Sequence, residues 1–261
     1  MDDLARFNKE RWEELSAANV DYARPMLDLD AESARQVVDP FSVMGEVQGK
    51  DVLCLASGGG QQSVAFGLLG ARVTVLDFSE NQLERDRQAL AHYGLQARLV
   101  QGDMRDLSVF GTDAFDLVWH AFSINFVPDC RPVFDQVVKV LRPGGLYRME
   151  WHNPFTMDMD ECEWTGAGYP IKHPYVDGAF NATNTYWVIQ NESDETPRRI
   201  EGPREFNHRL STVINGLIGR GFVLMGLWEE LTKDPDAEPG TWEHYKAFAP
   251  PWLTIWARYQ P

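Results

Sequence analysis

Residues 51–77 read DVLCLASGGGQQSVAFGLLGARVTVLD, and their pattern indicates an α/β fold. The apolar run at 52–55 is too short for a helix and predicts a strand buried on both faces. Gly58, Gly59 and Gly60 follow, and then an apolar-periodic segment at 64–69 that ends at Gly70. A second short strand, at 73–76, leads to Asp77. The predicted order is strand, glycine turn, helix, strand.

This order is typical of a site for a nucleoside-containing cofactor. A glycine turn lets the backbone approach a ligand closely, and the free N–H groups at a helix start favour electronegative atoms. Asp77 lies 17 residues after Gly60, about where a βαβ unit places an acid that accepts from ribose hydroxyls. Many strand-to-helix turns are rich in glycine, so a turn without a ligand stays open as the alternative.

Length and charge narrow the classes of function. A chain of 261 residues suits one α/β domain with an insertion. Its formal net charge of −15 repels phosphate backbones, so we expect no nucleic-acid partner and no anionic membrane partner. No run reaches the ~18 apolar residues of a membrane span. Cys54, Cys130 and Cys162 show no CxxC spacing, and the start of the chain lacks an apolar signal core. We therefore expect a cytoplasmic protein.

The remaining chain alternates strands and helices, as a parallel sheet covered on both faces requires. Strands are predicted at 97–100, 115–119 and 146–151, after two amphipathic helical segments before residue 39. That helical prelude folds over a cofactor or closes the sheet edge. Strands at 222–228 and 252–259 are joined by a proline-rich segment that leaves no room for an ordinary crossover helix. We expect those two strands to form an antiparallel hairpin.

An aromatic-rich insert follows the strand at 146–151. Residues 151–190 are one-fifth aromatic, against 12% for the whole chain. The eight rings are Trp151, Phe155, Trp164, Tyr169, Tyr175, Phe180, Tyr186 and Trp187. They predict a lid over a flat or apolar substrate, and the alternative is a small satellite core.

Five co-linear motifs resemble those of the class I S-adenosylmethionine-dependent methyltransferases, of the small-molecule type with a UbiE-like core. The motifs are the glycine loop at 54–60, Asp77, Ser79 after it, Gly102-Asp103-Met104 and the 141–145 segment LRPGG. The terminal helix and hairpin also match the end of this family's sheet. The resemblance implies a Rossmann-like, seven-stranded sheet ending in an antiparallel hairpin. It divides a single domain, 1–261, into a helical cap (1–45), a cofactor-binding core (46–150), a substrate-lid insert (151–202) and a C-terminal helix and hairpin (203–261).

The resemblance also implies the cofactor, S-adenosyl-L-methionine, and the residues that bind it. Asp77 would hold the ribose hydroxyls, Phe78 and Met104 the adenine faces, and Asp103 the adenine amino group. The expected cofactor-binding residues are Tyr22, Ala56, Ser57, Gly58, Gly60, Gln61, Asp77, Phe78, Gln82, Gly102, Asp103, Met104, His120, Ala121 and Asn125. Two positions depart from the family pattern, because Cys54 replaces its first acid and Ala56 its first glycine. The methionine end of the cofactor must then be held from elsewhere, with the 57–60 backbone and Tyr22 as candidates.

Histidines are the candidate general bases, because their ordinary pKa is near neutrality. His120, at the end of a central strand, is expected nearest the sulfonium methyl, and His208 is the second catalytic candidate. The expected substrate-binding residues are His152, Trp164, Tyr169, His208 and His244, whereas His92 and His173 are interpreted as surface residues. No HExxH or CxxC arrangement predicts a metal site.

The resemblance and these residues together predict an S-adenosylmethionine-dependent methyltransferase acting on oxygen or nitrogen, less readily carbon, of a small aromatic or heterocyclic metabolite. Three alternatives stay open. An NAD-dependent oxidoreductase would want glycine at Ser63. A non-catalytic S-adenosylmethionine-binding protein would lack a pocket beside the methyl group, and a protein or RNA methyltransferase fits the acidic charge poorly.

Overall fold

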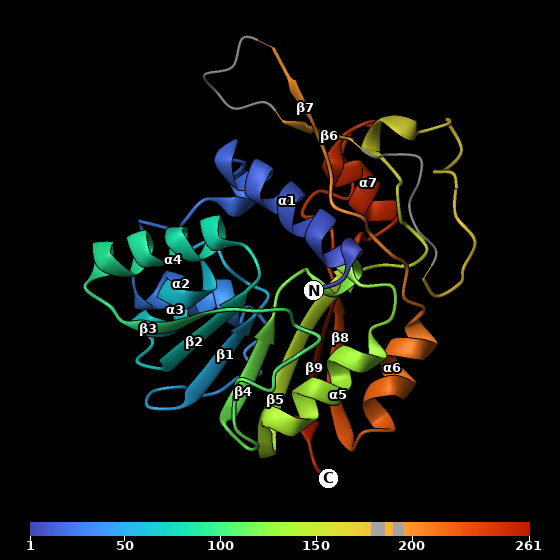
Figure 1. Cartoon of the computed structure of the whole chain (residues 1–261). Coiled ribbons are helices and arrows are strands. Elements are labelled where there is room, and N and C mark those ends of the chain that lie inside the picture. Colours follow the sequence, from blue (N-terminus) through green and yellow to red (C-terminus); the bar gives the residue numbers. More distant parts are fainter. Residues whose placement is uncertain (179–185, 190–195) are drawn as a thin grey trace.

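The computed structural model describes residues 1–178, 186–189 and 196–261. Phe180, one of the eight aromatic residues of the insert, lies outside the described residues. The centre of the molecule is a seven-stranded sheet of order β3-β2-β1-β4-β5-β9-β8 (Figure 1). Its strands are β1 (Asp51–Leu55), β2 (Arg72–Asp77), β3 (Ala97–Gln101), β4 (Phe115–His120), β5 (Leu141–His152), β8 (Phe222–Glu229) and β9 (Trp252–Tyr259).

The pairing confirms the predicted parallel sheet and the terminal hairpin. Strands β3, β2, β1, β4 and β5 pair in parallel, whereas β9 is antiparallel to both β5 and β8. The connection between β8 and β9 contains a short helix, α7 (Trp242–Phe248), that the sequence analysis did not predict. A second, two-stranded antiparallel sheet of β6 (Tyr186–Ile189) and β7 (Arg198–Glu201) was also not predicted.

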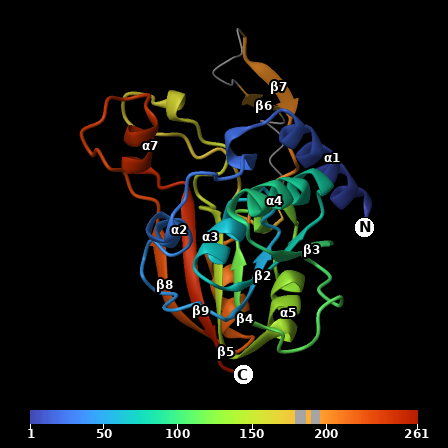
Figure 2. The same cartoon turned by 90° about the vertical axis from the view of Figure 1, so that its left-hand side faces the viewer.

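Helices cover both faces of the large sheet (Figures 1 and 2). One face carries α2 (Ala31–Val38), α3 (Gln62–Leu68) and α4 (Glu80–Tyr93), and the other carries α5 (Arg131–Val140) and α6 (Leu210–Ile218). This explains the unbroken apolar run in β1. Leu53 and Leu55 pack into the core on the α5–α6 face, while Val52 and Cys54 pack into the core on the α2–α3 face.

The carboxyl ends of the parallel strands are covered by the N-terminal helices (Figure 1). Helix α1 (Asp3–Ala17) crosses above them, followed by the short 3-10 helix η1 (Asp21–Ala23). Helix α1 is capped at its N-terminus by Asp2, whose carboxylate accepts a hydrogen bond from the Ala5 amide. The expected N-terminal helical cap is thus present. Within the described residues, no helix is both long enough and apolar enough to cross a membrane.

Candidate active site

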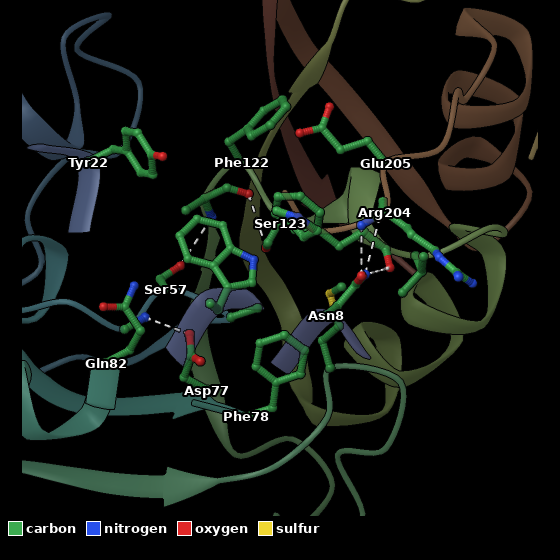
Figure 3. A pocket seen from close by; sticks show the side chains of 18 of the residues that line it. Asn8, Tyr22, Ser57, Asp77, Phe78, Gln82, Phe122, Ser123, Arg204 and Glu205 are labelled. Carbon is green, nitrogen blue, oxygen red and sulfur yellow. Dashed lines mark hydrogen bonds between the residues drawn. The ribbon is translucent and has the colours of Figure 1, made fainter. Parts of the chain in front are cut away.

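A cavity of about 740 Å³ lies at the carboxyl ends of β1, β2, β4 and β5, beneath α1 (Figure 3). Its volume is within the range of small-molecule sites, about 300–1,000 Å³. Most of the expected cofactor-binding residues line it, from four separate loops and the cap: Tyr22, Ala56, Ser57, Gly58, Gln61, Asp77, Phe78, Gln82, Gly102, Asp103, Met104 and Ala121.

The glycine loop is held against the end of β2 by the Asp77 carboxylate. Its Oδ2 accepts from the Gly58 amide at 2.9 Å and its Oδ1 accepts from the Ser79 amide at 2.8 Å. A Cβ at Gly58 would lie 2.7 Å from the Gln82 Cβ and 3.1 Å from the Asp77 Cβ, so the loop packs this closely only with glycine. Burial raises the Asp77 pKa to about 6, although the two amide hydrogen bonds act to lower it.

A second buried carboxylate, Asp86 on α4, organises the same loop. Its oxygens accept from the Gly59 and Gly60 amides, each at 3.1 Å, and from the Ser63 hydroxyl at 2.5 Å. Burial raises the Asp86 pKa to about 7. The sequence analysis missed Asp86, because an acidic residue on an amphipathic helix is usually interpreted as a solvent-exposed carboxylate.

The two departures from the family pattern have different consequences. The Cys54 side chain is fully buried in the core on the α2–α3 face, so it cannot replace an acid that faces a ligand. Burial raises its thiol pKa well above the ordinary value. Ala56, in place of a glycine, has φ +46°, a left-handed conformation that is unfavourable for an L-residue with a side chain. The turn therefore keeps its shape at a cost in backbone strain.

Phe78 and Met104 line the part of the cavity beyond the glycine loop, together with Asp103. The Asp103 carboxylate is held by Arg105, whose guanidinium also pairs with Asp2 at 2.7 Å. These two ion pairs raise the Arg105 pKa. They also connect the start of α1 to the predicted adenine end of the site.

The cap is fastened at two further points. Asn8 on α1 donates to the carbonyl oxygens of Phe126 and Arg204 and accepts from the Arg204 amide at 2.8 Å (Figure 3). The Glu13 carboxylate accepts from the amides of Glu80 and Asn81 at the start of α4. Helix α1 thereby encloses the cavity, which its own Leu4, Phe7 and Trp12 help to line.

His152, at the end of β5, lies in the cavity as expected. Its ring packs with Phe122 and Trp252, the latter with ring centroids 4.8 Å apart. Neither ring nitrogen has a hydrogen-bond partner within the described part of the chain. Burial lowers the His152 pKa to about 4, against weaker opposing effects of the Thr156 backbone and Asp158. The imidazole is therefore neutral at pH 7.

The two expected catalytic histidines lie elsewhere. His120 is fully buried, and its Nδ1 is 2.9 Å from the Tyr147 hydroxyl in the core on the α5–α6 face. Burial, aided by Arg148, lowers the His120 pKa to about 3. His208 is also fully buried, and its Nε2 lies 3.0 Å from the backbone carbonyl oxygen of Ile124. As a correction, neither ring is among the described residues that line the cavity.

Three expected substrate-binding residues also lie apart from the described lining of the cavity. Trp164, Tyr169 and His244 pack together with α7, and the Tyr169 hydroxyl is 2.7 Å from His244 Nδ1. This packing fits the alternative interpretation of the insert, a small satellite core, although Trp164 and Tyr169 are partly exposed. The insert still reaches the cavity, through Asp158, Met159 and Trp187.

Two expected cofactor-binding residues, Gly60 and Asn125, lie outside the cavity lining and pack against the segments that form it. Gly60 packs against α4, where a Cβ would come within 2.7 Å of the Ala89 Cβ. Asn125 donates to the Phe206 carbonyl at 3.0 Å and accepts from the His152 amide at 3.0 Å. His173, interpreted as a surface residue, is partly buried, and its Nε2 is 3.2 Å from the Asp158 carboxylate.

Comparison with known proteins identifies the family. The Methyltransferase domain family matches residues 53–149. The Bacillus subtilis (strain 168) uncharacterized methyltransferase YbaJ is 37% identical over 188 residues, which cover 70% of each chain. The chain is a class I S-adenosylmethionine-dependent methyltransferase. A demethylmenaquinone methyltransferase of Clavibacter sepedonicus is 39% identical over 99 residues, 38% of this methyltransferase and 40% of that protein.

A solved structure supports the same fold. The S-adenosylmethionine-dependent methyltransferase from Mesorhizobium loti superimposes with a TM-score of 0.63 and 24% identity, over 89% of this chain and 100% of that one. The cofactor of this methyltransferase is S-adenosylmethionine, and the residues present fit it. Each Asp77 carboxylate oxygen accepts one hydrogen bond from a backbone amide. Because a carboxylate can accept about four hydrogen bonds, Asp77 can still accept from the ribose hydroxyls.

Proposed function

We propose that this methyltransferase transfers a methyl group to a nitrogen or oxygen atom of a small aromatic or heterocyclic metabolite. The observation that carries the proposal is the position of His152, a neutral imidazole that lines the cavity. Its two ring nitrogens are buried and have no hydrogen-bond partner within the described part of the chain. We place the cofactor on the side of Asp77, Phe78 and Met104, and the acceptor on the side of His152.

When bound, S-adenosylmethionine supplies an electrophilic methyl group on a sulfonium centre. The chain then has to align the acceptor atom and exclude water from the site. A neutral imidazole accepts a hydrogen bond from an O–H or N–H group and so orients the lone pair of that atom. With a pKa near 4, His152 is a weak base, and we assign it chiefly to positioning the acceptor.

The aromatic side chains around His152 suit a flat ligand. Phe122 and Trp252 meet edge to face with ring centroids 4.4 Å apart, and both line the cavity beside His152. Aromatic walls of this kind bind flat or apolar groups and keep water out. The acceptor named for the Clavibacter relative is not transferred to this chain, because the match spans less than half of that protein.

The test is methyl transfer from S-adenosylmethionine carrying a deuterated methyl group to a panel of small phenols and aromatic or heterocyclic amines, followed by mass spectrometry. We expect label on nitrogen or oxygen of at least one class. His152→Ala should lower kcat/KM by about 10²-fold, the loss expected when a reacting group is misaligned, with cofactor affinity within a few fold.

His92→Ala is the matched control, because that histidine is exposed and lies outside the cavity lining. Its kinetics should equal those of the wild type. Cofactor binding without transfer to any nitrogen or oxygen acceptor would contradict the proposed reaction. An unchanged kcat/KM in His152→Ala would remove His152 from the acceptor site.

A further inference from the structure

Three aromatic rings form a corner at one end of the cavity. Trp12, Tyr22 and Trp187 come from α1, η1 and β6, and all three line the cavity. Each pair of rings is in contact, with centroids 5.4–6.1 Å apart and planes crossing at 78–90°. Three nearly perpendicular ring planes make the corner of a box. Boxes of this kind bind organic cations through the negative faces of the rings.

A carboxylate faces the same end of the cavity. The Glu205 side chain projects into the cavity from the side opposite Tyr22, whose hydroxyl points toward it (Figure 3). Burial raises the Glu205 pKa to about 7, and the negative charge of Asp158 contributes a smaller part of this increase. Burial and the nearby Glu205 also raise the pKa of Tyr22. In the part of the chain that the structure describes, no hydrogen bond or ion pair is made by the Glu205 carboxylate.

The charged side chains next to Glu205 already have partners. Asp158 pairs with His173, and Glu201 pairs with Arg11 at 3.2 Å. The adjacent Arg204 places its guanidinium over the Phe7 ring, 4.6 Å from the centroid. Burying an ionised carboxylate is costly unless a cation accompanies it, so Glu205 favours a ligand with positive charge.

We propose that the Glu205 carboxylate and the corner of Trp12, Tyr22 and Trp187 form a subsite for an organic ammonium group of the methyl acceptor. This inference rests on the proposed function, since it names a feature of the acceptor that enters the same cavity. The subsite recognises the charged group and takes no part in the transfer itself.

The ammonium could instead belong to the methionine end of the cofactor, and the connections in the structure favour the acceptor. The Phe206 amide, next to Glu205, donates to the Asn125 carbonyl at 2.7 Å, and Asn125 Oδ1 accepts from the His152 amide. Glu205 is therefore fastened to the strand end that carries His152. The glycine loop is fastened to Asp77 and Asp86, and its Gln61 Nε2 also donates to the Tyr22 carbonyl oxygen at 3.0 Å. It is therefore the carboxylate of Glu205 that connects the subsite to the His152 side of the cavity.

The experiment measures binding to the protein saturated with S-adenosylhomocysteine, by calorimetry, for an isosteric pair of probes. One probe is 3-hydroxyphenyltrimethylammonium, and the other is 3-tert-butylphenol, which has the same shape without the charge. The cation should bind about tenfold more tightly than the neutral probe, as expected for a cation held by rings and a carboxylate. Glu205→Gln should remove most of that preference and leave the neutral probe unaffected.

Two controls separate the possible causes. Glu238→Gln removes the same charge from an exposed position and should change neither probe's affinity. Trp187→Leu should weaken the cation several-fold more than the neutral probe. S-Adenosylhomocysteine affinity is measured for every variant and should stay within twofold.

The outcomes are distinguishable. Equal affinities for the two probes, or an unchanged preference in Glu205→Gln, would overturn the ammonium subsite while leaving the methyltransferase function intact. A loss of S-adenosylhomocysteine affinity in Glu205→Gln would assign the carboxylate to the cofactor and overturn the proposal. Failure of every nitrogen and oxygen acceptor in the transfer assay would instead contradict the proposed reaction.

Discussion

Asp86 illustrates how one buried side chain can shape a ligand-binding loop without facing the ligand. It accepts from two consecutive backbone amides and a hydroxyl, and it is fully buried. Asp77, at the end of β2, also accepts a hydrogen bond from a loop amide, and unlike Asp86 it lines the cavity. The loop is thus held from two elements, which leaves its conformation largely formed before a cofactor arrives.

We predict that Asp86→Asn weakens both the fold and cofactor binding. An asparagine presents one oxygen and one NH2 group, so at least one loop amide would meet a donor and lose its partner. An unsatisfied buried amide costs about 1–3 kcal/mol, and we expect the free energy of unfolding to fall by that amount. Urea denaturation and S-adenosylmethionine calorimetry measure the two effects. Glu84→Gln, on an exposed position of the same helix, is the control.

The same variant should change the pH dependence of stability. The folded-state pKa of Asp86 is about 7, above its ordinary value near 4, so the folded state binds a proton more tightly than the unfolded state. Its contribution to stability is greatest at low pH and is lost as the pH rises from about 4 to about 7. The wild type minus Asp86→Asn difference in unfolding free energy should therefore shrink across this range. A difference that grows with pH would contradict the assignment.

At the scale of elements, α1 joins parts of the chain that are far apart in sequence. Asn8 connects it to residues 126 and 204, Glu13 to the start of α4, and Asp2 to Arg105. The described part of the insert has two roles: Trp187 closes the cavity, whereas Trp164 and Tyr169 pack on α7. The closed cavity thus depends on contacts made by α1.

We predict that Asn8→Ala weakens the packing of α1 over the cavity. Asn8 is 1% exposed, and its removal leaves two carbonyl oxygens and one amide without their partner. We expect a loss of about 1–3 kcal/mol in unfolding free energy and faster release of S-adenosylhomocysteine in stopped-flow measurements. Glu10→Ala, an exposed position on the same helix, should leave the release rate unchanged. Equal release rates for Asn8→Ala and the wild type would show that α1 does not control access.

At the scale of the whole molecule, the net charge of −15 is the dominant property. Like charges on a compact surface repel one another, and folding brings them closer together. Some of the acidic groups are compensated by ion pairs, such as Arg142 with Asp51 and Asp116. The excess of 39 acidic over 24 basic residues leaves most of the repulsion in place.

We predict that salt stabilises this protein. Raising NaCl from about 10 mM to about 300 mM shortens the screening length from about 30 Å to less than 10 Å. Repulsion between distant carboxylates then falls more than attraction within close ion pairs, which contribute at most about 1 kcal/mol each. The melting temperature should rise by a few degrees in calorimetry at pH 8. A fall in melting temperature would show that the ion pairs outweigh the net charge.

Sequence patterns alone predicted the large sheet, the glycine turn and most of the expected cofactor-binding residues that line the cavity. These features depend on residues close together in the chain, whose spacing sets local backbone geometry. Asp77, for example, follows the glycine loop at the spacing of one βαβ unit, and it lies in the cavity. The terminal hairpin was predictable for a similar reason, because its connection was too irregular for an ordinary crossover helix.

The sequence did not show which histidine faces the cavity or which distant residues line the cavity beside it. His120 and His152 both end central strands, yet one ring enters the core with Tyr147 and the other enters the cavity. A strand covered on both faces has no polar–apolar alternation, so its sequence does not show which way a given side chain points. Trp12, Trp187 and Glu205 come together from distant segments, and only the packing of α1 on residues 203–206 brings them to one cavity.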